Sequence, residues 1–242
     1  MNSAIYVESW AAMILRGPDA EPRRLGQCKD ESVIPAGHRR RLGSYGRMAV
    51  TCGLSVAGAD SSDLVFCSRY GDVDLAYGLL KSLAVGEILS PAAFSLSVHN
   101  SVPGVMDLVR KSRVGHTAIA AGAQSLSAGL AEAWAKLAAK PEQTITLVFA
   151  EGELPPDLKP FSEVQGYGLA LAMTLSATNS NQALGQFSFE SIGDGRAASA
   201  DMTSEELAGK IAFLLDASER RIDPLHWRSR GLEWSFSACT DA

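Results

Sequence analysis

The sequence has 242 residues, of which 46% are hydrophobic and 20% are charged, and its formal net charge is -5. This composition is typical of a globular protein with a substantial core and not of a disordered chain. The acidic balance excludes the broad positive surface of nucleic-acid-binding proteins, so we expect no nucleic-acid partner.

The chain shows no targeting or membrane-spanning signal. Its first apolar run lacks a preceding basic segment and is interrupted by Glu8, which argues against a signal peptide. No stretch approaches the ~18 uninterrupted apolar residues of a membrane span, so we expect a cytoplasmic protein. The four cysteines form no C-x-x-C pair, and H-E-x-x-H and complete G-x-G-x-x-G motifs are missing, so we predict neither a metal nor a cofactor.

In the first half of the chain, short strands are predicted to alternate with helices. The run AIYV predicts a buried strand at 4–7, and the segment 16–37, rich in Gly, Pro and charge, predicts a loop. The next predicted elements are a helix within 40–56, a strand at 63–68 and a helix at 72–87. Residues 92–98 alternate apolar residues with serines, which predicts a strand or an extended loop, and a helix with Pro103 in its first turn follows at 102–112.

The second half begins with a strand of small residues at 116–121 and a helix at 124–140. One apolar stripe runs along this helix and consists of Leu126, Leu130, Trp134 and Leu137. The remaining predicted elements are strands at 144–152, 167–177 and 186–191, a helix at 204–217 and a strand at 232–237. The strands at 167–177 and 186–191 are predicted to pair with each other around the turn between them.

The order of these elements predicts an α/β fold. Strands alternate with helices and then follow one another directly, which favours a mainly parallel sheet with an antiparallel edge. No internal repeat or convincing linker is evident, so we expect a single domain over residues 1–242.

The strand–turn–helix HTAIAAGAQSLSAGLAEA is the strongest candidate for a site. It brings the chain to a helix N-terminus, where unpaired N–H groups and the helix dipole favour negative charge. A cysteine there would be an activated nucleophile, but this junction has none. Ser125 is better explained as a helix cap than as a nucleophile, since no G-x-S-x-G motif surrounds it. His99 and Asn100 are likewise better explained as turn residues than as a catalytic dyad.

Four segments, taken in order, resemble the N-terminal half of β-ketoacyl-ACP synthases. They are LVFCSRYGD, GEILSPAAFSLSVHNSVPG, HTAIAAGAQSLSAGLAEAWAKL and LVFAEGELPP. More narrowly, they resemble the short ketosynthase-like proteins of aryl polyene biosynthesis that serve as chain length factors. The resemblance covers about residues 35–175, and the part from 180 onward matches only weakly.

The resemblance implies a thiolase-like fold, here approximately one half of the two-fold repeated ketosynthase fold, with a mixed sheet packed by helices. A ketosynthase carries its acyl-accepting cysteine where the strand at 117–121 meets the next helix. That position falls on Ala121 or Gly122, and neither has a nucleophilic side chain. The half that carries the family's catalytic histidines has little room after residue 175. We therefore expect a catalytically degenerate homologue with no catalytic residue of its own.

The family also implies partners. An inactive subunit pairs with an active ketosynthase as a heterodimer, and the acyl chain carried by acyl carrier protein extends into a tunnel along their interface. Family dimers pair across the strand before the nucleophile, so the predicted interface residues are His116, Thr117, Ala118, Ile119, Ala120 and Ala121. The candidate tunnel or loop residues are Phe94, Ser97, His99, Asn100 and Met106.

These implications lead to one functional hypothesis and two alternatives. The hypothesis is a non-catalytic chain length factor that helps an active ketosynthase elongate a polyene bound to acyl carrier protein. The first alternative is a scaffold that stabilises the ketosynthase without shaping the product. The second is an independent acyltransferase or hydrolase that uses Ser125 or His99.

Overall fold

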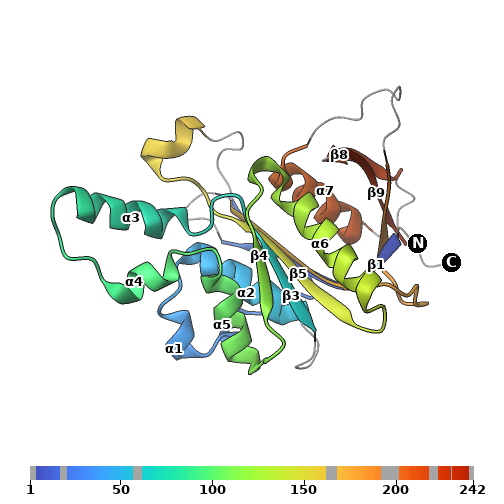
Figure 1. The fold of residues 1–242 in the computed structure, drawn as a ribbon, viewed down its shortest axis with the longest axis horizontal. Helices are drawn as coiled ribbons and strands as arrows, with labels where there is room; N and C mark the ends of the chain where they lie inside the picture. The colour runs from blue at the N-terminus through green and yellow to red at the C-terminus, as the bar shows by residue number, and fades with distance from the viewer. Residues whose placement is uncertain are drawn as a thin grey trace.

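The computed structural model of the chain describes residues 4–16, 21–56, 62–161, 168–191, 202–217, 223–229 and 231–239. These residues form a nine-stranded sheet with helices on both faces (Figure 1). The strand order is β4-β3-β5-β6-β1-β7-β9-β8, and β2 pairs with β1 beside this path. The strands are β1 (Ala4–Leu15), β2 (Arg23–Gly26), β3 (Asp63–Cys67), β4 (His116–Ile119), β5 (Thr144–Glu151), β6 (Gly168–Ser176), β7 (Gly185–Ser191), β8 (Leu225–Ser229) and β9 (Leu232–Ala238).

The sheet is mixed, as expected, but the prediction that it is mainly parallel is wrong. Strand β3 pairs in parallel with β4 and β5, and every other strand pairing described is antiparallel. The alternation of strands and helices that suggested a parallel sheet holds only for the segment from β3 to β5. The strands outside that segment form antiparallel pairs that the element order does not reveal.

The expected pairing of β6 with β7 is also wrong, because β1 lies between them. Strand β1 continues to Leu15, well past the predicted end at Val7, and pairs with β7 near its start and with β6 along most of its length. A register shift at Glu8 interrupts the alternation that predicts a strand. The Glu8 carboxylate accepts hydrogen bonds from the hydroxyls of Ser176 and Ser180, each at 2.7 Å, so the strand tolerates this charge.

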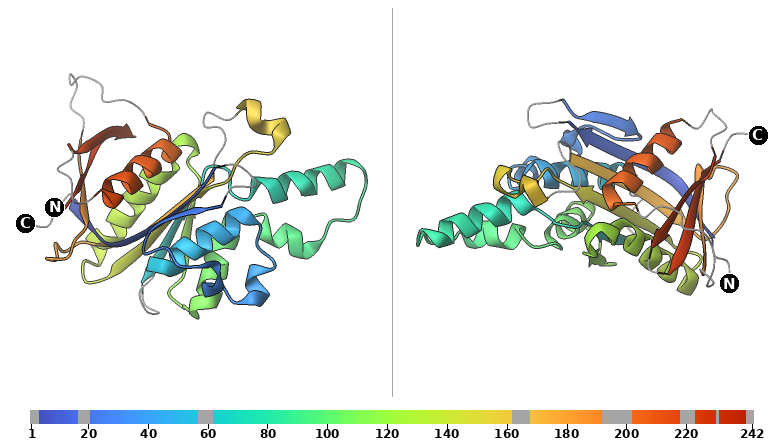
Figure 2. Two further views of the ribbon diagram at one scale, coloured as in Figure 1. Left: turned by 180° about the vertical axis from the view of Figure 1, so that it is seen from behind. Right: turned by 90° about the horizontal axis from the view of Figure 1, so that it is seen from above.

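Helices lie on both faces of the sheet (Figure 2), and a hydrophobic core lies between the sheet and the helices on each face. Alternating strand residues point to opposite faces, so Leu147 and Phe149 enter one core while Val148 and Ala150 enter the other. Helices α6 (Ser125–Ala139) and α7 (Ser204–Asp216) cover the first core, and α2 (Ser44–Val56) and α5 (Ser101–Arg110) cover the second. The predicted helices at 40–56, 102–112, 124–140 and 204–217 are therefore confirmed within a few residues at each end.

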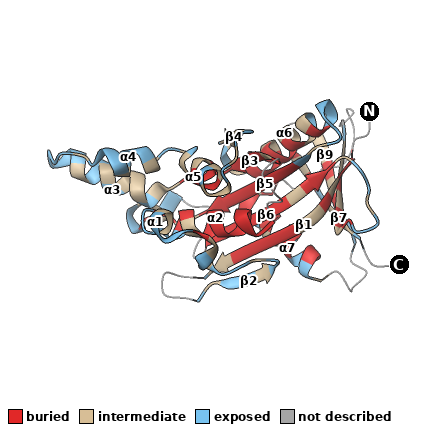
Figure 3. Ribbon diagram, turned by 90° about the horizontal axis from the view of Figure 1, so that it is seen from below, coloured by how far each residue is buried: buried red, intermediate tan, exposed pale blue. Residues whose placement is uncertain are grey.

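Helices α3 (Val73–Ala84) and α4 (Pro91–Leu96) form an arm that projects away from both chain termini (Figures 1 and 3). Neither helix contains a buried residue. The prediction of a strand or extended loop at 92–98 is wrong, because Ser90 and Pro91 start a helix there. The Ser90 hydroxyl accepts the backbone N–H of Ala93 at 3.3 Å, and Pro91 suits the first helical position.

The segment predicted as a loop, 16–37, contains regular structure in its described part. It includes β2, the 3-10 helix η1 (Glu31–Val33) and the start of the short helix α1 (Ala36–Arg39). Residues 17–20 of that prediction lie outside the described residues. Sequence analysis also missed β8 and the 3-10 helix η3 (Pro156–Phe161). No helix in the described ranges is long and apolar enough to cross a membrane.

The last strands carry an aromatic cluster over the first core. Trp227 and Trp234 stack with ring centroids 5.9 Å apart, and Phe187 and Phe236 approach to 4.6 Å. The Trp134 ring of α6 meets Phe189 edge-on at 4.9 Å. Of the predicted stripe on α6, the three leucines are buried and Trp134 is half-buried. This cluster fixes α6, the helix that follows the candidate site, against β7 and β9.

Candidate functional site

The candidate site is the turn between β4 and α6. Strands β3 and β4 run in parallel and end together, and the Ser68 N–H donates to the Ile119 carbonyl at 3.1 Å just beyond them. The chain then passes through the 3-10 helix η2 (Gly122–Gln124) into α6. Gly122 adopts a φ of 61°, a left-handed conformation that favours glycine. The backbone of this turn is thus well defined, while Ala121 and Gly122 offer no side chain that can carry an acyl group.

Ser125 is buried, and its hydroxyl both accepts and donates a hydrogen bond within this turn. The Oγ atom accepts the N–H of Ala121 at 3.0 Å and donates to the carbonyl of Gly122 at 2.7 Å. These bonds hold the turn before α6 together, but Ser125 is the first residue of α6 and Gln124 is the N-cap, so the Ser125 hydroxyl does not act as an N-cap. No described base contacts Ser125, so the geometry gives no support to a nucleophilic role.

The N-termini of α6 and α7 meet at this turn. The Ser204 hydroxyl accepts the N–H of Leu126 and donates to the carbonyl of Ala123, each at 2.9 Å. Two helix N-termini side by side create a positive potential. Glu205 lies in the first turn of α7, where that potential favours its charge, and it is 8% exposed.

Glu151 adds a second buried carboxyl group at the end of β5. It accepts hydrogen bonds from the backbone N–H groups of Arg69 and Tyr70, and it is 3% exposed. The pKa of Glu151 is raised to about 8, mainly by burial and also by the nearby charge of Glu205, against the opposing effect of the backbone hydrogen bonds. The Glu151 carboxyl is therefore largely protonated at neutral pH.

Two further polar atoms near the turn have no hydrogen-bond partner among the described residues. They are the Oε1 atom of Gln124 and the Oε2 atom of Glu205. Sequence analysis did not select Glu151 or Glu205, because the first follows an apolar run and the second precedes one, and neither belongs to a recognisable motif. The available signal at Glu151 was an acidic residue directly after the apolar run LVFA, where an unpaired charge is costly.

His99 and Asn100 lie at the start of α5 and do not form a hydrogen bond with each other among the contacts described. The His99 ring lies against Gly71, where a Cβ would come within 3.2 Å of the ring, and the φ of 65° at Gly71 also favours glycine. The Nε2 atom of His99 is buried without a described partner. Asn100 is exposed and makes no side-chain capping hydrogen bond.

The remaining candidate tunnel or loop residues are not brought together. Phe94 is 59% exposed on α4, and the Ser97 hydroxyl donates to the Phe94 carbonyl at 2.9 Å. Met106 is fully buried in α5, where its side chain fills the space beside Gly53 of α2. Phe94 and Ser97 therefore belong to the arm, whereas Met106 belongs to the second core.

The predicted interface strand β4 lies at one end of the sheet. Its partner within the sheet is β3, and no other described strand pairs with its free edge. His116 bonds through Nδ1 to the Asp107 carboxylate at 2.7 Å, and Thr117, Ala118 and Ile119 are half-buried. Ala118 packs against the second core and Ile119 against the first. Beyond the strand, Ala121 is half-buried and Ala120 is exposed.

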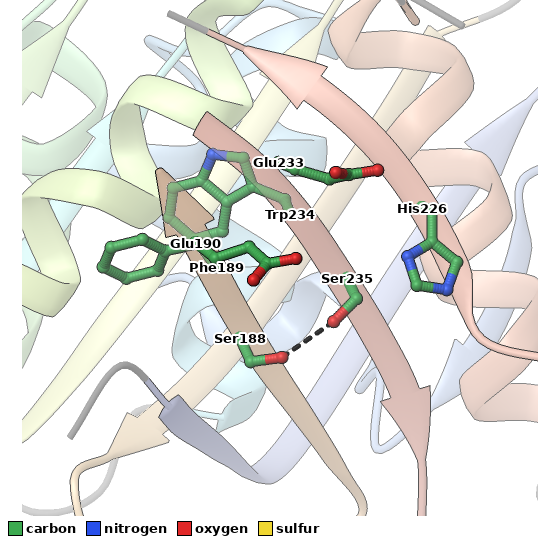
Figure 4. A pocket seen from close by; sticks show the side chains of 7 residues that line it. All are labelled: Ser188, Phe189, Glu190, His226, Glu233, Trp234 and Ser235. Atoms are coloured by element: carbon green, nitrogen blue, oxygen red, sulfur yellow. Dashed lines mark hydrogen bonds between the residues drawn. The ribbon is translucent and has the colours of Figure 1, made fainter. Parts of the chain in front are cut away.

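A separate hollow of about 460 Å³ lies on β7, β8 and β9, away from β4 in the strand order (Figure 4). The hydroxyls of Ser188 and Ser235 are hydrogen-bonded at 2.7 Å across its floor, and Glu190 stands opposite Glu233 in the strand register. No group of three or more His, Cys, Asp or Glu residues in the described part of the chain is placed to hold a metal ion. The hollow is therefore a polar surface distinct from the β4–α6 turn.

Solved structures with the same fold include several ketosynthases. A chain in the complex of the ketosynthase ApeO with its chain length factor ApeC, from Xenorhabdus doucetiae, has a TM-score of 0.74 and 23% identity, with 97% of this chain and 99% of that chain covered. The ishigamide ketosynthase/chain length factor has a TM-score of 0.55 and 10% identity, with 78% and 67% covered. A β-ketoacyl synthase from Burkholderia phymatum has a TM-score of 0.54 and 15% identity, with 87% and 71% covered.

These likenesses confirm the expected thiolase-like fold, of which the 242-residue chain has roughly half. A search of curated protein sequences found no match. The family model described as the N-terminal domain of β-ketoacyl synthase matches residues 10–237. Since this match spans most of the sequence, the chain belongs to the β-ketoacyl synthase family.

Proposed function

We propose that this chain is a non-catalytic chain length factor that pairs with an active ketosynthase and helps elongate a polyene bound to acyl carrier protein. The β4–α6 turn carries the proposal. It keeps the strand and helix that present a nucleophile in a ketosynthase, yet Ala121 and Gly122 cannot form an acyl thioester. Ser125, the nearest hydroxyl, is committed to hydrogen bonds within the turn.

The proposed partner surface begins at the free edge of β4. Unpaired N–H and C=O groups on a sheet edge readily pair with another chain, and small side chains let two backbones approach closely. Ala120 follows the strand and is exposed. The likeness to a chain in a ketosynthase–chain length factor complex supports a ketosynthase as the occupant of this edge.

The projecting arm extends this proposed surface. Several of its large apolar side chains are more than half exposed, which is unusual for a monomer and typical of an interaction site. They are Leu80, Leu83, Val85, Ile88 and Phe94, of which Ile88 is 100% exposed. Phe94, Ser97, His99 and Asn100 lie on or beside this arm and stay our candidates for residues that line or position an acyl tunnel. Met106, being buried in the second core, would act only through its packing.

Co-purification with the associated ketosynthase tests the pairing. Ala120→Glu places a charge on an exposed position beside the β4 edge, where pairing would desolvate it without a partner, so we expect the complex to be lost. Ala135→Glu makes the same change on an exposed face of α6 and should leave the complex intact. Ala118→Glu is a weaker test, because Ala118 also contacts the core. If folded Ala120→Glu protein still co-purifies, this edge is not the interface.

Two measurements separate the alternatives. Enlargement of exposed Phe94 to Trp should shorten the polyene while the complex persists if the subunit shapes the tunnel, whereas unchanged product length across such variants would favour a scaffold. An independent acyltransferase or hydrolase would form an acyl adduct on the isolated chain. We expect mass spectrometry after incubation with acyl-loaded acyl carrier protein to show no adduct on Ser125 or His99.

A further inference from the structure

Two cysteines that are distant in sequence meet in the second core. The sulfur atoms of Cys28 and Cys52 lie 3.9 Å apart, although 24 residues separate them in the chain. Cys28 follows β2, and Cys52 lies in the middle of α2. A disulfide bond is about 2.05 Å long, so the sulfurs need to approach by roughly 2 Å to form one.

The backbone around Cys28 is held in place on both sides. The N–H of Gln27 donates to the carbonyl of Trp10 in β1 at 2.9 Å. The N–H of Lys29 donates to the hydroxyl of Ser55 in α2, also at 2.9 Å. These bonds fix the segment after β2 against the helix that carries Cys52, so the approach of the two sulfurs is a property of the folded chain.

The two thiols differ in exposure and acidity. Cys28 is half-buried, and its pKa is lowered by its hydrogen bond with Cys52 and by the positive charge of Arg24, against the opposing effect of burial. Cys52 is fully buried, and burial raises its pKa. Because the thiolate is the reactive form of cysteine, Cys28 is suited to react first, while Cys52 stays protonated beside it.

We propose that Cys28 and Cys52 are a redox-active pair that forms an intramolecular disulfide when the folded protein meets a hydroperoxide. The Cys28 thiolate attacks a peroxide oxygen, an S–O bond forms, the O–O bond breaks and hydroxide leaves, which gives the sulfenic acid at Cys28. The Cys52 sulfur then attacks the Cys28 sulfur, an S–S bond forms and the S–O bond breaks, and water leaves with the Cys52 proton. With hydrogen peroxide, two thiols and one peroxide become one disulfide and two waters.

Peptide mapping of the full-length protein tests this proposal. The folded protein is treated with a small excess of hydrogen peroxide, denatured in the presence of N-ethylmaleimide so that buried free thiols are also blocked, and then digested. We expect a linked peptide pair containing Cys28 and Cys52, two hydrogens lighter than the sum of its parts and released by dithiothreitol. Tandem mass spectrometry assigns the link to Cys52, because trypsin leaves Cys52 and Cys67 on one peptide.

Variants make the outcome decisive. Cys28→Ser should abolish the link, and Cys52→Ser, which keeps a hydrogen-bond donor beside Cys28, should leave a sulfenic acid on Cys28 that dimedone traps. Cys239→Ser removes an exposed thiol and should leave the link unchanged. The proposal is overturned if the folded wild-type protein keeps both thiols free to react with N-ethylmaleimide after unfolding. It is equally overturned if the link joins Cys28 to Cys67 or Cys239.

Discussion

Glu151 takes up a proton when the chain folds, because its pKa is about 8 in the folded protein and 4.5 in the unperturbed state. Between these values the unfolded chain releases the proton while the folded chain retains it. The free energy of unfolding should therefore fall as the pH rises from about 4.5 to about 8, and below 4.5 the group contributes nothing. This ionisation makes the ketosynthase-like turn sensitive to pH even though it lacks a nucleophile.

We predict that Glu151→Gln removes this pH dependence. Glutamine resembles the protonated carboxyl group and can still accept a backbone hydrogen bond from Arg69. The variant should match the wild type near pH 4.5 and exceed its free energy of unfolding at pH 8 by roughly 3–5 kcal/mol, since one pKa unit corresponds to about 1.4 kcal/mol. Urea denaturation from pH 4.5 to 9 measures the difference.

Two controls belong with this prediction. Glu142→Gln alters an exposed carboxyl group in the turn just before β5, and this variant should follow the wild-type pH profile. Glu205→Gln removes a charge that raises the pKa of Glu151, so it should weaken the pH dependence without abolishing it. Parallel profiles for the wild type and Glu151→Gln would show that Glu151 is not the titrating group.

Among the elements, α6 connects the candidate turn to the aromatic cluster through Trp134 and Phe189. Full truncation of a buried Trp costs about 3–5 kcal/mol, but Trp134 is only half-buried, so we predict about 2–3 kcal/mol for Trp134→Ala. Trp134→Phe should retain most of the edge-to-face contact. A double-mutant cycle with Phe189→Leu, measured by urea denaturation, should give a coupling of about 0.5–1.5 kcal/mol. A coupling near zero would show that this contact does not hold α6 in place.

Periodicity predicted the elements whose neighbours in sequence are also their neighbours in space. Helix α6 and strand β5 follow one another and pack together, so their apolar patterns were sufficient. The central place of β1 could not be predicted in this way, because its partners β6 and β7 lie far along the chain and Glu8 hides its full length. Helix α4 was missed because the serines of 92–98 mimic a strand, although the Ser90–Pro91 start was a usable signal.

The residues of the candidate site likewise fall into those that the sequence identifies and those that only the tertiary structure brings together. Ser125 could be selected because it stands where a strand meets a helix, and Ala121 and Gly122 could be selected through the resemblance to ketosynthases. Glu151 and Glu205 reach the same region from β5 and α7, and only the fold brings them near each other. Phe94 lies on an exposed arm and Met106 lies in a buried core, although only 12 positions separate them in the sequence. This difference depends on tertiary packing, so the local sequence does not reveal it.

At the scale of the whole molecule, the arm is difficult to explain in an isolated subunit. The exposed apolar side chains on α3, α4 and their connection are only partly covered within the chain, and Ile88 has no buried surface to lose. A partner that covers Ile88 would gain about 1.5–3 kcal/mol from its burial, which corresponds to roughly a ten- to hundredfold change in affinity. We therefore expect substitutions on the arm to weaken the complex without changing the stability of the isolated subunit.

We predict that Ile88→Ser leaves the isolated subunit as stable as the wild type and raises the dissociation constant of the ketosynthase complex at least tenfold. Phe213→Ser is the matched control, because Phe213 is 63% exposed on α7, on the opposite side of the sheet from α2 and α5. It should alter neither quantity. Urea denaturation of the subunit and titration of the two purified subunits by calorimetry provide the values. Equal dissociation constants for the wild type, Ile88→Ser and a Leu83→Ser/Ile88→Ser double variant would show that the ketosynthase does not cover the arm, and the proposed surface would then shrink to the edge of β4.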